Sequence, residues 1–306
     1  MRFDELLKLS KEEPILKNKN IAHLAINLNK IVSENSVPGL LLEVKEMKNG
    51  VNIKMAVSKD VKIKEPIHLC FGLTHEQALQ KINLNILVSK NAKICVIAHC
   101  LFPQAIKVKH IMKARIRIKE NATYVYKEKH FHGVQGGVKV DAKTIVRLDK
   151  RAIYKNTFVL IEGSVGKLNL DYNVTGKEES VAELMTKVSG SGKDIIKVRE
   201  VNNLIGEKAR GVLSSKIAVC DDAKAEVYNV MKATAPYAVG HIDCQEIIQD
   251  NGEATSIPIV KVNNSKARIT HETAIGSVDQ KQLETLMARG LNRNEATKAI
   301  IAGLMS

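Results

Sequence analysis

Three stretches of this sequence match one another: residues 83–92 read NLNILVSKNA, residues 113–122 read KARIRIKENA and residues 143–152 read KTIVRLDKRA. Each carries an apolar alternation, in turn Ile86/Val88, Ile116/Ile118 and Val146/Leu148, and successive stretches begin thirty residues apart. Such alternation is typical of a half-buried β-strand, and a constant interval of this size indicates stacked repeats. Each stretch therefore predicts one strand, a polar turn and a small residue at the corner that follows.

Alanine marks the predicted corners and extends the pattern along the chain. The three stretches end at Ala92, Ala122 and Ala152, and Ala182 continues the interval. Farther on, alanines in similar polar context are Ala209, Ala223, Ala254 and Ala267, at separations of 27, 14, 31 and 13 residues. The short intervals are about half the long ones, which indicates two strand–turn units per coil. The sequence therefore predicts a mainly β protein, a parallel β-helix, because no single coil buries its inward face without neighbours.

A β-sandwich is the competing fold. Its strands would be joined by tight hairpins roughly every 8–12 residues, and the Asn-Gly pairs suited to such hairpins are few, at Asn49-Gly50 and Asn251-Gly252. The longer regular period favours the solenoid. Alternation of apolar residues from Val51 to Val57 indicates that the first strands already belong to it, and a short amphipathic helix is expected before Pro14.

Size and composition set further bounds. A chain of 306 residues with 44% hydrophobic residues is long enough for one large or two medium domains. It contains no run of eighteen uncharged apolar residues and no apolar signal region at its amino end, so we expect a cytoplasmic protein without membrane insertion. Five cysteines without CxxC spacing argue against a disulfide framework and against a zinc site of sequence-local ligands.

The formal net charge of +14 raises the alternative of nucleic-acid binding. The basic residues are spread along the chain, Trp is absent, and aromatic residues make up only 4%. Stacking platforms for single strands would therefore be scarce. A solvated basic surface, or attraction to an acidic partner protein or an anionic cofactor, explains the charge better.

The carboxyl-terminal residues 270–306 predict a helical hairpin. Ser277 and Gln280 have capping-box spacing, and apolar residues then recur at helical spacing. Arg289-Gly290 suits a helix end, and Asn292 with Glu295 suits the cap of a second helix.

This tail, HETAIGSVDQKQLETLMARGLNRNEA at residues 271–296, resembles the end of the SufB/SufD proteins of iron–sulfur cluster assembly. A family-like Lys-x-Pro-Ile step also occurs as Lys64-Glu65-Pro66-Ile67, and the resemblance covers residue 50 onward. It implies a right-handed parallel β-helix with short helical segments at both ends: a mixed amino-terminal segment at 1–49, a β-helix core at 50–270 and a hairpin at 271–306. It further implies a scaffold and not an enzyme, which carries a transient iron–sulfur cluster and works with a SufC-like ABC ATPase. The resemblance places the ATPase at the hairpin, through Leu283, Leu286, Met287, Arg289, Gly290 and Leu291.

The same resemblance directs attention to Cys244, in HIDCQEIIQDNGEA at residues 241–254, and to His271 and Glu272. Soft thiolate ligands suit iron and sulfide, and an imidazole or a carboxylate can complete the set. Stacked half-coils could bring the three residues together. Taken without the resemblance, Cys244 is better explained as a buried structural thiol, and the resemblance favours the ligand role instead. In a two-fold dimer each chain would contribute the same ligands to one cluster. A homodimer is preferred, and a SufB/SufD paralogue is the other candidate partner.

Cys100 is a candidate sulfur acceptor. It matches the family's Gly-Cys-x-x-Pro segment loosely, with His99 in place of Gly, and a thiolate there could take sulfur from a cysteine desulfurase or another donor. Core packing explains it equally well. His130 and His132 lie on one side of an extended strand and could bind zinc or iron, but a third ligand is missing nearby in sequence.

Residues 189–194 imitate a phosphate loop, yet Lys187 and Asp194 replace its first glycine and its final hydroxyl residue. No ATP site is therefore expected on this chain, and its residues do not decide whether a flavin takes part. Two other functions stay open: an adaptor that recruits the ATPase without a cluster, and a polysaccharide-cleaving solenoid enzyme, for which no consistent register of acidic residues is present.

Overall fold

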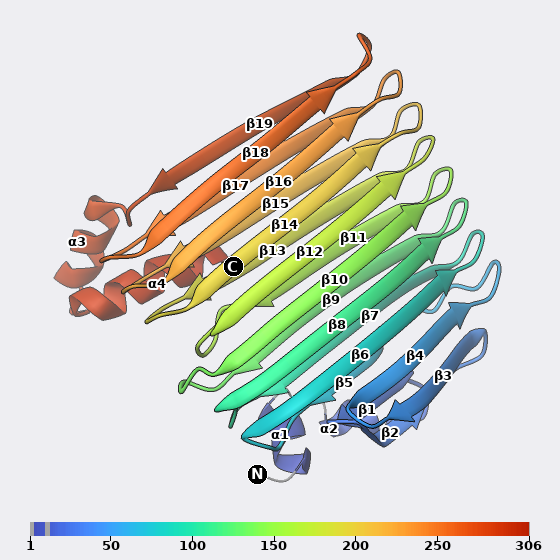
Figure 1. The fold of residues 1–306 in the computed structure, drawn as a ribbon, viewed down its shortest axis with the longest axis horizontal. Helices are drawn as coiled ribbons and strands as arrows, with labels where there is room; N and C mark the ends of the chain where they lie inside the picture. The colour runs from blue at the N-terminus through green and yellow to red at the C-terminus, as the bar shows by residue number, and fades with distance from the viewer. Residues whose placement is uncertain (1–2, 10–12, 306) are drawn as a thin grey trace.

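The computed structural model describes residues 3–9 and 13–305. Their strands form two long, mainly parallel sheets (Figure 1). The 10-stranded sheet has the order β19-β17-β15-β13-β11-β9-β7-β5-β1-β2 and the 9-stranded sheet the order β18-β16-β14-β12-β10-β8-β6-β4-β3. The strands of the first are β1 (His23–Asn27), β2 (Lys30–Asn35), β5 (Ile67–Gly72), β7 (Lys93–Phe102), β9 (Thr123–His132), β11 (Ile153–Leu160), β13 (Val181–Gly190), β15 (Arg210–Val219), β17 (Val239–Ile248) and β19 (Arg268–Gly276). Those of the second are β3 (Leu40–Met47), β4 (Gly50–Val57), β6 (Gln77–Val88), β8 (Lys107–Ile118), β10 (Val138–Leu148), β12 (Lys167–Gly176), β14 (Ile195–Leu204), β16 (Lys224–Ala233) and β18 (Glu253–Val262).

From β4 onward the chain alternates between the two sheets, so each coil contributes one strand to each. Ile86 pairs with Ile116, and Ile116 pairs with Val146, in parallel register. Each of these side chains is at most 5% exposed, because the inward-facing half of every strand lies against the other sheet. The expected parallel β-helix, with two strand–turn units per coil, is confirmed.

One corner of the coil repeats a left-handed residue followed by a small buried one. Asn91, Asn121 and Arg151 have φ between 54° and 60°, and the alanine after each is 0% exposed. Neighbouring corners are joined by hydrogen bonds from Asn121 Nδ2 to Asn91 Oδ1 (3.0 Å) and from Arg151 Nε to Asn121 Oδ1 (2.6 Å). Close stacking of successive coils leaves no room for a larger side chain at the alanine positions.

The proposed alanine series is wrong at two places. Ala182 pairs with Tyr154 inside the strands, so the corner position after Ala152 belongs to Ser180. The interval between paired residues shortens there from 30 to 28 residues. Ile153 pairs with Thr123 of the preceding coil and with Val181 of the following coil. Ala254 likewise lies within β18, where it pairs with Ala225 of β16, and does not mark a corner.

The amino-terminal end of the solenoid is closed by local elements. Helix α1 (Phe3–Leu9) packs Phe3, Leu6 and Leu7 against Ala25, Cys70 and Leu101, and α2 (Glu13–Leu16) follows it. Strands β2 and β3 pair antiparallel with β1 and β4. Residues 1–49 thus contain strands of both sheets, so the solenoid begins before the expected boundary at residue 50.

The expected helical hairpin follows the last strand. It consists of α3 (Gln280–Ala288) and α4 (Arg293–Met305). The cap of α3 is Asp279, whose Oδ1 accepts from Gln282 N at 2.8 Å, and not the expected Ser277. The second capping box has the expected form: Glu295 N donates to Asn292 Oδ1 at 3.0 Å, and Asn292 N donates to Glu295 Oε2 at 2.9 Å.

The hairpin packs on the outer surface of the 10-stranded sheet. Its Leu283, Ala296 and Ile301 form a cluster with Ala218 of β15, and Ile247 of β17 packs against the same cluster. Strand β19 runs to Gly276, so the expected boundary at residue 271 falls inside a strand. Among the described helices, none is long and apolar enough to cross a membrane.

Candidate functional site

Cys244 lies on the inward face of β17, near the carboxyl-terminal end of the solenoid. It is 1% exposed, and its Sγ accepts a hydrogen bond from Asn229 Nδ2 of β16 at 3.2 Å. The register places Ser215 and Thr273 beside it on the neighbouring strands. The Asn229 Oδ1 atom is buried without a hydrogen-bond partner among the described residues. A buried amide oxygen without a partner is costly, so a bound group or a water that satisfies it would be stabilised at this point.

His271 shares this inward face, but Glu272 does not. His271 pairs with Ile242, which is 0% exposed and two residues before Cys244, so both belong to the inward set. From the strand spacing and rise, the Cα atoms of His271 and Cys244 are about 8 Å apart. Glu272 pairs with Asp243, and adjacent residues of a strand point to opposite faces. The structure therefore brings Cys244 and His271 together and directs Glu272 to the outer face.

Glu246 is a functional candidate that the sequence reasoning missed. It lies two residues after Cys244 on the same inward face, is 2% exposed, and neither carboxylate oxygen has a hydrogen-bond partner among the described residues. Burial raises its pKa to about 7, against the opposing effect of the nearby Ser256 hydroxyl. The signal was present in the sequence, because a period of two puts residues 244 and 246 on one face.

The end of the solenoid beside these residues is open. Val260 and Val262 pair with Met231 and Ala233, and Ile275 pairs with Glu246, so all three belong to inward faces. They are nevertheless 36%, 43% and 46% exposed, because no further coil covers them. Strands β18 and β19 are also the edges of their sheets (Figure 1). Unpaired edges with exposed apolar residues are a template for pairing with another chain.

Cys100 lies far from this end and inside the core. It is 0% exposed on β7, and burial, followed by the charge of Glu128, raises its pKa well above its ordinary value. In sheet order β7 is five strands from β17, which corresponds to about 24 Å. A protein donor of sulfur would reach Cys100 only after local opening of the coils.

The expected ATPase-binding residues divide between buried and exposed positions. Leu283 is 2% exposed, and Leu286 and Leu291 are partly buried against the hairpin's own cluster. Arg289 is the C-cap of α3, and Gly290 has φ of 98°. Met287 is 40% exposed and is therefore the apolar residue of this set that the hairpin presents outward.

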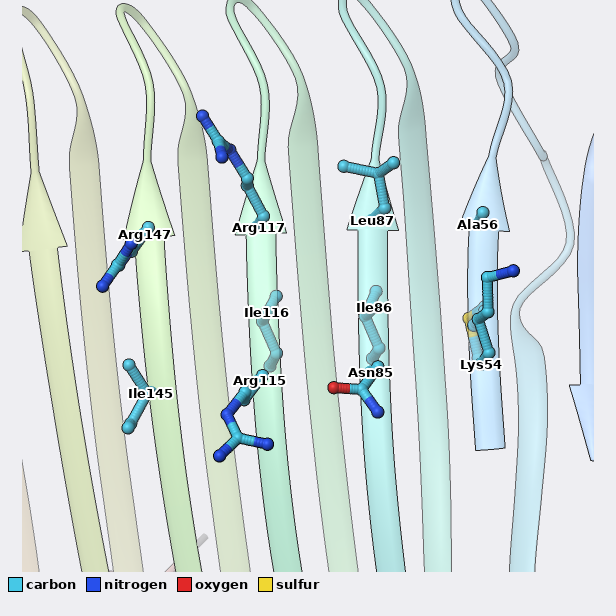
Figure 2. A pocket seen from close by; sticks show the side chains of 11 residues that line it. Lys54, Ala56, Asn85, Ile86, Leu87, Arg115, Ile116, Arg117, Ile145 and Arg147 are labelled. Carbon is cyan, nitrogen blue, oxygen red and sulfur yellow. The ribbon is translucent and has the colours of Figure 1, made fainter. Parts of the chain in front are cut away.

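A shallow basic pocket lies on the outer surface of β4, β6, β8 and β10 (Figure 2). Its floor is apolar, with Leu87 and Ile145 each 37% exposed, and Lys54, Arg115, Arg117 and Arg147 surround it. None of the candidate cluster ligands lines it. The segment that imitates a phosphate loop is a turn between two strands, where Asp194 accepts hydrogen bonds from Val165 N and Gly166 N at 2.9 and 2.7 Å.

Comparison with known proteins identifies relatives over the whole chain. The family model described as "SUF system FeS cluster assembly, SufBD core domain" matches residues 71–304. An iron–sulfur cluster assembly SufBD family protein of Methanocaldococcus jannaschii is 39% identical over 100% of this chain and 97% of its own length. One of Pyrococcus horikoshii is 36% identical over 99% of this chain and 93% of its own. The iron–sulfur cluster assembly protein SufB of Bacillus subtilis is 23% identical over 81% of this chain and 54% of its own length.

Proposed function

The chain belongs to the SufBD family of iron–sulfur cluster assembly proteins, and from this membership we propose that it is a scaffold on which a nascent cluster is built between two copies of the chain. The cluster is the cargo of the protein and leaves it for a recipient. Cys244 supplies the thiolate, and His271 supplies the imidazole. The observation that carries the proposal is the common inward face of these two residues on adjacent strands at an open end of the solenoid.

The donor set suits such a cargo. Iron–sulfur clusters prefer thiolates, and replacement of thiolates by harder ligands makes a cluster easier to release. Glu246 adds a buried carboxylate to the same face, in place of Glu272, which points outward. The unpartnered oxygens of Glu246 and Asn229 can bind iron of the cluster or accept hydrogen bonds from water beside it.

One chain holds too few of these ligands for a cluster. Two copies related by a two-fold axis contribute two thiolates and two imidazoles, which makes four ligands. Exposed inward residues at the open end, Val260, Val262 and Ile275, supply the apolar surface for this pairing. An identical copy is preferred because every required group is present on this chain.

The hairpin is proposed as the contact for an ABC-type ATPase. It lies on the outer surface of β15 and β17, the strand that carries Cys244, so a force on α3 and α4 acts close to the site. Met287 is exposed on α3 for such a contact. ATP hydrolysis by the partner would then shift the contact between the open ends of the two copies toward an open or a closed arrangement.

Anaerobic reconstitution with ferrous iron and sulfide tests the scaffold role. The parent chain should develop the visible absorption of a cluster, and Cys244→Ser should lose most of it. Cys95→Ser is the matched control, because that half-buried thiol lies on β7, far from β17. A parent chain that folds but gathers no cluster would leave the adaptor function as the better account.

A further inference from the structure

The interior of the solenoid contains a second group of ligating side chains, remote from the open end. Cys100 on β7, His110 on β8, and Glu128 and His130 on β9 are each at most 4% exposed. Cys100 Sγ, a Glu128 carboxylate oxygen and a His130 ring nitrogen all lie within 4.8 Å of one another. His110 Nε2 lies 3.9 Å from the same sulfur atom.

The hydrogen-bond partners of the histidines direct their free lone pairs toward this point. His132 Nδ1 lies 3.0 Å from the Ser164 carbonyl oxygen, which only accepts, so His132 must donate there and present Nε2 as an acceptor. His130 Nδ1, 3.3 Å from that Nε2, must then donate to it. In a neutral ring this leaves the lone pair of His130 Nε2 facing Glu128 Oε1 at 2.9 Å.

His110 repeats the pattern from the other sheet. The Gln80 amide donates from Nε2 to the Leu28 carbonyl at 2.9 Å, which fixes its oxygen toward His110 Nδ1, also at 2.9 Å. His110 therefore donates from Nδ1 and aims an unprotonated Nε2 at Cys100 Sγ. Metal-bound histidines are typically oriented in this way, by an outer hydrogen bond from the other ring nitrogen.

The ligand atoms of Cys100, Glu128 and His130 thus face one another, and His110 Nε2 faces the same sulfur atom. With Glu128 ionised and both rings neutral, the thiol proton is the only hydrogen that these contacts supply. The separations are close to those between the ligands of a small cation. Ligands of a tetrahedral zinc site at 2.0–2.3 Å from the metal lie about 3.3–3.8 Å from one another. Here Cys100 Sγ lies 3.6 Å from Glu128 Oε1 and 3.9 Å from His110 Nε2, and His130 Nε2 lies 2.9 Å from Glu128 Oε1. The first distance lies within this range, the second just above it and the third below it.

We propose that Cys100, His110, Glu128 and His130 form a binding site for one divalent transition-metal ion, Zn²⁺ or Fe²⁺. The mixed sulfur, nitrogen and oxygen donors suit these ions and not Mg²⁺ or Ca²⁺. Phe102 and Phe158 surround the site, with ring centroids 5.1 Å from His110 and 4.9 Å from His130. The ion links β7 and β9 to β8 of the opposite sheet, and it enters as the coils close during folding.

Cobalt provides the test, because Co²⁺ takes the same geometry and a thiolate-to-cobalt charge-transfer band reports the sulfur ligand. The full chain, in a Cys244→Ser background that removes the thiolate of the open end, is refolded anaerobically with Co²⁺. We expect one Co²⁺ per chain with this band, loss of the band in Cys100→Ser, and a Co²⁺ affinity lowered at least about tenfold in Glu128→Gln.

Glu200→Gln is the matched control, because Glu200 is also a 0% exposed interior carboxylate but lies on β14. It should bind Co²⁺ like its parent. Glu128→Gln should fold without metal, since its amide can donate to His130 Nε2. A folded parent that retains no Co²⁺, or a charge-transfer band that survives Cys100→Ser, overturns the site. Because every chain in the test lacks Cys244, neither result bears on the cluster scaffold.

Discussion

The two faces of β19 assign different roles to neighbouring residues. His271 points toward the interior beside Cys244, whereas Glu272 points outward beside Asp243. We expect His271→Ala to weaken cluster binding at least about tenfold, because a direct ligand should cost no less than the 10–100-fold typical of outer-shell partners. Glu272→Ala should bind like the parent. Iron and sulfide content after anaerobic gel filtration measures both, and an equal loss in the two variants would refute the assignment of faces.

Glu246 should make the stability of the chain depend on pH. Burial raises its pKa from 4.5 to about 7, so between these values the folded state holds a proton that the unfolded state has lost. The free energy of unfolding therefore falls as pH rises from about 4.5 to 7 and is level above that range. At about 1.36 kcal/mol per pKa unit, and with allowance for partial screening, the change is roughly 1–3 kcal/mol.

Glu246→Gln should remove this dependence. Urea unfolding at pH 5 and pH 8 measures it, with the exposed Glu253→Gln as the control. A parent chain that gains stability over this interval, or a variant with the parent's slope, would show that the carboxyl of Glu246 is not the group responsible.

At the level of single residues, the alternation of side chains between the two faces of a strand determines which site residues could be predicted. The sequence pointed to Cys244 and His271, and the structure places them on adjacent strands. The family resemblance added Glu272 as the neighbour of His271, but a period of two separates neighbours and puts Cys244 and Glu246 on the same face. The group around Cys100 was beyond reach, because its members meet only through the register that pairs Cys100 with His130.

The corners of the coils are the elements that fix the spacing of the solenoid. Ala122 is 0% exposed and lies between the corners of the coils before and after it. Ala122→Leu should destabilise the chain by about 1–3 kcal/mol, because overpacking forces the neighbouring coils apart. Ala302→Leu on the exposed face of α4 is the matched control and should be nearly neutral. Thermal unfolding compares the two, and similar transitions in both variants would contradict close stacking at the corner.

Prediction of these elements succeeded where the interval was constant. The 30-residue period is a direct consequence of coil length, so Ala92, Ala122 and Ala152 were placed correctly at corners. It failed at Ala182 because the next coil is two residues shorter, and Ser180 fills the corner with a small side chain of another type. A turn can lose residues without disturbing the strands, so corner spacing is the least predictable part of the repeat.

The two ends of the molecule differ in a way that favours assembly. Helices and antiparallel strands close the amino-terminal end, whereas inward residues of β18 and β19 are exposed at the other. Terminal units of repeat proteins normally carry a polar cap, and the proposed second copy would cover this open end instead. Val262→Lys should abolish self-association, because a charge on this edge opposes pairing.

Light scattering after size exclusion measures that association. Val134→Lys is the control, since Val134 is 89% exposed in the turn after β9, away from the open end. A parent that is monomeric at every concentration, or a Val262→Lys variant that remains dimeric, would place the contact elsewhere.

Native mass spectrometry of the anaerobically reconstituted chain tests the shared site most directly. The expected species has the mass of two chains and one cluster, and Cys244→Ser should give two chains without it. A cluster retained by single chains, or by dimers of Cys244→Ser in unchanged yield, would contradict a cluster held between two copies.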